Sequence, residues 1–72
     1  MTSQTPQQLL DLYYHDLRHH LLEAAAAFDR ISRAGQLPPD DHRLERLQQL
    51  LPILADDQPD KAQRLLEALS VN

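Results

Sequence analysis

The residues best suited to chemistry are imidazoles and carboxylates in the first third of the chain. His15, His19 and Glu23 follow one another at intervals of four residues, which brings neighbouring side chains to one side of a helix. Two histidines spaced in this way can bind one divalent cation, and a carboxylate can complete the ligand set. These three residues are therefore candidate metal ligands. The competing interpretation is a solvated polar face, because successive steps of four drift around a helix and no second cluster of this kind occurs in the sequence.

Other kinds of catalysis find little support in the residue types. The chain contains no cysteine and a single glycine, which excludes a thiol nucleophile and a glycine-rich phosphate loop. Its serines lie outside the G-x-S-x-G pattern of a nucleophile elbow. Short helices of leucine and alanine also offer little concave surface on which to build a reactive site. We expect a protein that is not an enzyme and carries no cofactor.

Composition and charge narrow the range of partners. The 72 residues are enough for one domain, spanning 1–72. Seven basic residues are outnumbered by eleven acidic ones, for a net charge of −4, and the basic residues are scattered, whereas nucleic-acid binding requires them clustered. The apolar runs are too short to span a membrane, and the first residues do not resemble a secretory signal. We expect a cytoplasmic protein that binds neither nucleic acid nor membrane, and its preference for arginine over lysine suggests a bacterial source.

A long helix is predicted over residues 6–34, after a polar lead at 1–5. Thr5 and Gln8 are placed to form a capping box at its start. Apolar residues then recur at alternating steps of four and three, which is the pattern of an amphipathic helix. Gly35 follows where a left-handed residue commonly ends a helix. The residues of this apolar stripe are Leu10, Tyr14, Leu17, Leu21, Ala24, Phe28 and Ile31.

A second, shorter helix is predicted over residues 40–55. Asp40 or Asp41 can cap its N-terminus, where a negative charge also complements the helix dipole. Pro52 interrupts the apolar pattern and removes one backbone hydrogen bond. This helix is therefore expected either to kink near Pro52 or to end at Leu51.

A third helix is predicted over residues 59–70, with Asp60 and Arg64 placed for an ion pair one turn apart. No segment shows the alternation typical of a strand. The predicted fold is therefore all-α. One long N-terminal helix has two shorter helices packed back on it, as a three-helix bundle or helical hairpin.

The lengths of these helices leave apolar surface uncovered. The first would be ~43 Å long, whereas the other two would each reach only about half that length or less. A chain this small rarely gains more than ~3–5 kcal/mol from a single core, so we expect a homodimer or a helical protein partner. The competing interpretation is a monomer with a few exposed leucines, which is common. The two short helices can lie along one side of the long helix, which leaves its other side open. The candidate interface residues, which fall outside the main stripe, are Leu9, Leu12, Tyr13, His20 and Leu22.

The function predicted from these features is a small helical interaction or assembly module that self-associates through the helix at 6–34. The alternative is a metal-binding helical protein that uses the face bearing His15, His19 and Glu23. A third interpretation is a dimer whose association responds to pH through its clustered histidines.

Overall fold

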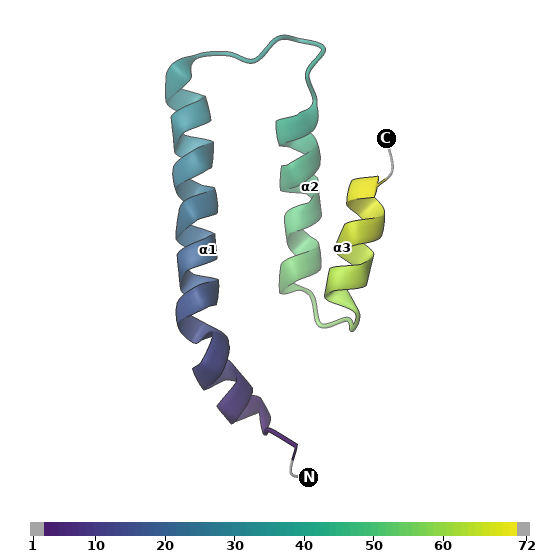
Figure 1. Ribbon diagram of the computed structural model, residues 1–72. Coiled ribbons are helices and arrows are strands. Elements are labelled where there is room, and N and C mark those ends of the chain that lie inside the picture. The colour runs from purple at the N-terminus through teal and green to yellow at the C-terminus, as the bar shows by residue number, and fades with distance from the viewer. Residues whose placement is uncertain (1–2, 71–72) are drawn as a thin grey trace. The chain divides into compact units, whose positions relative to one another are not determined.

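The computed structural model describes residues 3–70 and contains three helices and no strand within that range (Figure 1). They are α1 (Pro6–Ala34), α2 (Arg43–Ala55) and α3 (Lys61–Ser70). The predicted all-α fold, with one long N-terminal helix and two shorter ones, is confirmed. The chain divides into two compact units, Met1–Gln36 and Leu37–Asn72, and each is described by itself.

The first unit contains α1 and its two capping residues, Thr5 and Gly35. The Thr5 hydroxyl accepts a hydrogen bond from the Gln8 amide at 3.2 Å, and the Gln8 side chain accepts one from the Thr5 amide at 2.9 Å. This reciprocal pair is the expected capping box, and Pro6 occupies the first helical position, where no backbone donor is needed. At the other end, Gly35 has φ 129° and ψ −151°. The sign of φ is the one expected of a terminal glycine, but the conformation is more extended than the left-handed helical one.

The start of α2 differs from its prediction. The helix begins at Arg43 with His42 as its N-cap, and the His42 side chain makes no capping hydrogen bond. Asp41 lies one residue earlier than a cap and accepts from the Arg43 amide at 3.2 Å. Neither Asp40 nor Asp41 is therefore the N-cap, although the Asp41 carboxylate still satisfies one of the free amides at the start of the helix.

α2 does not end at Leu51, because the helix continues through Pro52 to Ala55. The proline lacks an amide to donate, but its own carbonyl accepts from the Asp56 amide at 2.9 Å. The last turn of the helix is thus closed by a residue beyond the proline. The missing hydrogen bond at Pro52 therefore does not terminate α2.

The second unit is a helical hairpin in which α3 runs back along α2 (Figure 1). The turn between them includes Asp60 at φ 59°, a left-handed conformation that aspartate adopts more readily than most residues. No residue of either helix is buried. The side chains half-buried in this unit include Leu44, Leu50, Ile53, Leu65 and Ala68.

The turn of the hairpin is organised around the carboxylate of Asp56. Lys61 Nζ lies 2.8 Å from Asp56 Oδ1, and Arg64 Nη1 lies 3.1 Å from the same oxygen. Lys61 also donates to the backbone carbonyls of Ile53 and Asp56, where a cation complements the C-terminal end of a helix dipole. The predicted pairing of Arg64 with Asp60 is wrong. Arg64 turns to Asp56 because the hairpin brings that carboxylate closer.

Candidate protein-interaction surface

The most distinctive surface of the first unit is the exposed N-terminal part of the apolar stripe on α1. Leu10, Tyr14, Leu17 and Leu21 are each more than half exposed, and Leu21 reaches 65%. Together with Arg18 and Leu22 they line a shallow, largely apolar hollow. Exposed apolar side chains that gather in one place, unlike scattered ones, are typical of an interaction site.

The C-terminal part of the stripe is less exposed. Phe28 is half-buried and Ile31 is 38% exposed, while Ala24 presents only a methyl group. The exposed apolar side-chain area that a partner could bury is therefore greatest between Leu10 and Leu22.

All five candidate interface residues are exposed, but they do not share one side of the helix. Tyr13 and His20 are seven residues apart and so lie almost in line, directly beside the stripe. Leu22 lines the hollow on the other flank. Leu9 lies further round from the stripe, and Leu12 lies about 200° from Leu10, on the opposite side of α1. Periodicity alone could have separated Leu12 from the other four.

The three candidate metal ligands are only partly brought together. The His19 imidazole Nε2 contacts the Glu23 carboxylate Oε1, and both side chains are well exposed. The His15 ring instead meets the Tyr14 ring edge-on, with centroids 5.7 Å apart. Over residues 3–70, no group of three or more His, Cys, Asp or Glu side chains is arranged to hold a metal ion.

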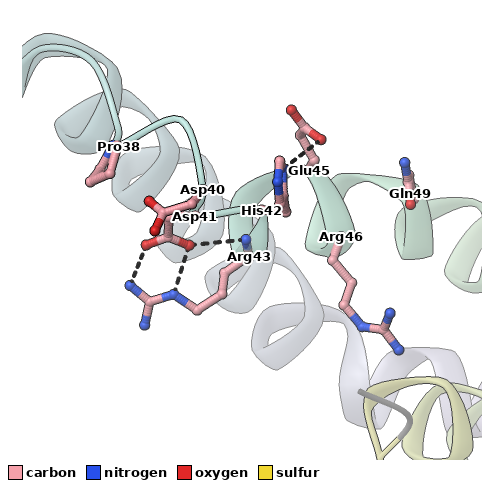
Figure 2. A pocket seen from close by; sticks show the side chains of 8 residues that line it. All are labelled: Pro38, Asp40, Asp41, His42, Arg43, Glu45, Arg46 and Gln49. Carbon is pink, nitrogen blue, oxygen red and sulfur yellow. Dashed lines mark hydrogen bonds and ion pairs between the residues drawn. The ribbon is translucent and has the colours of Figure 1, made fainter.

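A second hollow lies at the start of α2 and is lined mainly by charged and polar residues (Figure 2). Arg43 donates to both carboxylate oxygens of Asp41, from Nε at 3.0 Å and from Nη2 at 2.8 Å. These hydrogen bonds lower the pKa of Asp41 to about 2 and raise that of Arg43. His42 Nδ1 lies 3.6 Å from Glu45 Oε2. The residues lining this hollow are Pro38, Asp40, Asp41, His42, Arg43, Glu45, Arg46 and Gln49.

The charges at this second hollow are engaged in holding the local backbone. Asp41 is committed to Arg43 by three hydrogen bonds, two from the guanidinium and one from the amide, and Arg46 donates to the Ala68 carbonyl of α3. A carboxylate so strongly held in its charged form is a poor general base. The arrangement therefore accounts for the start of α2 rather than for a reaction. The sequence predicts Asp41 only as a cap, and the signal for the ion pair is the proximity of Asp41 and Arg43 at a helix start.

Comparison with known proteins gives no family or relative from which a function could be transferred. The chain matches no protein family, no curated protein and no solved structure. Within the part of the chain that the structure describes, no helix is both long and apolar enough to cross a membrane. The surfaces of the helices are therefore the basis for assigning a function.

Proposed function

We propose that this chain is a small helical protein–protein interaction module that self-associates through α1. The observation that carries the proposal is the row of exposed apolar side chains at Leu10, Tyr14, Leu17 and Leu21. A single helix has no apolar partner within its own unit, and helices in water draw most of their stability from packing an amphipathic face. A second copy of α1 offers a face of the same length and the same character.

The magnitude of the gain supports association. Fully burying one leucine side chain contributes about 1.5–3 kcal/mol, and a symmetric pair would bury each residue of the row twice. Against this stands the loss of translational and rotational freedom, which costs roughly 4–15 kcal/mol. The four side chains of each copy are 52–65% exposed before association, so burying the remainder in both copies contributes a free energy of similar size when they pack closely.

A monomer with exposed leucines is the simplest competing description, since isolated apolar residues on a surface need no explanation. Here, however, the exposed residues follow the period of the helix and line one hollow with Arg18 and Leu22. Apolar residues in helical register on one side are the requirement for helix-to-helix packing. This grouping favours association over chance exposure.

The decisive experiment is sedimentation equilibrium of the full chain over a wide concentration series. We expect the mass to rise from that of one chain toward that of two, with helix content rising in parallel by circular dichroism. A mass that stays at 8.3 kDa up to millimolar concentration contradicts self-association.

A further inference from the structure

We propose that two copies of α1 pair in antiparallel orientation over Leu10–Leu22, with Asp11 of each copy facing Arg18 of the other. The same alignment places Tyr13 of each copy opposite His20 of the other. This inference rests on the proposed self-association and specifies the partner, the orientation and the register.

The apolar stripe sets the possible alignments. Its alternating steps of four and three place Tyr14 and Leu21 at one type of core position, and Leu10 and Leu17 at the other. In an antiparallel pair each type packs against the other. Centring the pair between residues 15 and 16 therefore packs Leu10 against Leu21 and Tyr14 against Leu17. A twofold axis repeats both contacts, so all four of the most exposed stripe residues are covered.

The residues beside the stripe then meet in complementary pairs. Asp11 follows Leu10, and Arg18 follows Leu17, so in this alignment both lie on the same side between the two apolar layers. The carboxylate of one copy is thereby opposite the guanidinium of the other, and the twofold axis makes two such ion pairs. On the other side, Tyr13 and His20 each precede a core residue and face each other, which allows the tyrosine hydroxyl to hydrogen-bond to the imidazole.

Arg18 is available for such a contact. Among the described residues, Arg33, Arg43 and Arg64 each pair with a carboxylate of their own chain. No ion pair within residues 3–70 involves Arg18, although it lines the apolar hollow. A guanidinium at the edge of an exposed apolar face is suited to a carboxylate supplied by a partner.

Other alignments lose this complementarity. A parallel pair packs Tyr14 against Tyr14 and leaves Asp11 without an arginine across the interface. An antiparallel pair shifted toward the C-terminus covers Phe28 as well, but it places Arg18 against Arg18 and His20 against His20. Since flanking charges commonly select orientation and register in paired helices, the alignment with two attractive pairs is the favoured one.

Thiol cross-linking tests the register directly, because the chain has no cysteine of its own. Tyr13→Cys and His20→Cys variants are mixed and treated with a short bismaleimide, and the products are mapped by mass spectrometry. We expect the mixed product between positions 13 and 20 to dominate. A dominant product between two copies of His20→Cys indicates the shifted register. Efficient self-linking of Leu10→Cys indicates a parallel pair, because in the proposed alignment the two Leu10 positions are eleven residues, or ~16 Å, apart along the helix axis. Either result overturns the proposed alignment.

Charge reversal provides an independent readout that needs no cross-linker. Asp11→Arg and Arg18→Asp should each weaken dimerisation about tenfold, because each creates two like-charge contacts. The double variant Asp11→Arg with Arg18→Asp should restore the dissociation constant to within about threefold, since the pairs are re-formed with exchanged signs. Circular dichroism of each variant shows whether α1 remains helical.

The failures of the two proposals are distinguishable. If the unmodified chain is monomeric by sedimentation, self-association and the alignment are both contradicted. If it dimerises but the double charge reversal is no stronger than the single variants, only the alignment is contradicted.

Discussion

α1 and the α2–α3 hairpin differ in the contacts that stabilise their helices. The hairpin places two helices side by side and fastens its turn with one carboxylate, because Asp56 accepts hydrogen bonds from both Lys61 and Arg64. α1 is a single helix with a capping box at its N-terminus, and the stripe residues Leu10, Tyr14, Leu17 and Leu21 are more than half exposed. Within the hairpin α2 and α3 contact each other, whereas α1 has no second helix in its own unit.

The largest expected effect comes from removing the apolar character of the exposed face. Leu17→Gln should raise the dissociation constant of the proposed dimer roughly a hundredfold or more, because each of the two copies loses a leucine that the proposed contact buries. Leu12→Gln is the matched control, since the same substitution falls on the opposite side of α1 and should leave the dissociation constant within about threefold. If sedimentation showed that both variants weaken dimerisation equally, the proposed contact would not be confined to the side of α1 that bears Leu17.

A large effect in the opposite direction, a gain in stability, is expected from replacing Pro52 in the hairpin. Pro52→Ala restores a backbone amide inside α2 and should stabilise the hairpin by about 1–3 kcal/mol. Pro59→Ala, in the turn before α3, is the control. It should be neutral or slightly destabilising, because it only frees the unfolded chain. Urea unfolding of the two variants measures both, and a loss of stability in Pro52→Ala would mean that the proline assists the end of α2.

A smaller effect is expected from the carboxylate at the turn. Asp56→Asn should lower the melting temperature of the hairpin by several degrees, because Lys61 and Arg64 lose their shared charged acceptor. Asp57→Asn changes the neighbouring residue in the same way and should change the melting temperature little. Among the described residues, its carboxylate accepts only from the side-chain Nε2 of Gln58, at 3.0 Å. Equal effects would mean that the ion pairs of Asp56 contribute nothing specific.

Acid should also distinguish the two units, because it should weaken the hairpin unit, which contains both Asp41 and Asp56. Hydrogen bonds from Arg43 hold the pKa of Asp41 at about 2, and those from Arg64 and Lys61 hold the pKa of Asp56 well below its usual range. Because both values are depressed by folding, the stability they contribute is complete above about pH 4 and is lost as the pH falls toward 2. Residue-resolved amide exchange should show the hairpin loosening over this range, and Asp56→Asn should flatten the profile.

The smallest effect is expected from added zinc. The His19–Glu23 contact is a pair rather than a three-ligand site, so zinc should leave the melting temperature of the chain unchanged. A rise of several degrees that disappears in His19→Ala would instead assign a metal-binding role to the face bearing His15, His19 and Glu23.

Local features of the fold were predictable from the sequence because they depend on neighbours in the chain. The capping box of α1 and its termination before Gly35 follow from residues within one turn of each helix end. The start of α2 and the partner of Arg64 were not predictable in this way. Both depend on loop geometry, since the carboxylate that binds Arg64 lies eight residues away and is brought near only when the hairpin closes.

The candidate interaction surface on α1 was likewise predictable from the sequence only in part. Helical periodicity places the stripe on one side of α1, and the same arithmetic would have placed Leu12 on the other. The exposure of each stripe residue can be read only from the structure, because Phe28 and Leu21 occupy equivalent positions in the sequence pattern yet differ in exposure. The hollow at the start of α2 was missed because its ion pair joins residues of a loop and a helix end.

The backbone of Gly35 has a stereochemical consequence. Its φ of 129° and ψ of −151° are the mirror image of an ordinary extended residue, and a Cβ built there would meet no atom within 4 Å. An L-alanine at this position would be disfavoured by torsion alone, at a cost of order 1–3 kcal/mol, without any clash. A chemically synthesised chain with D-alanine at position 35 should keep the geometry at no such cost, so handedness rather than size is what this position selects.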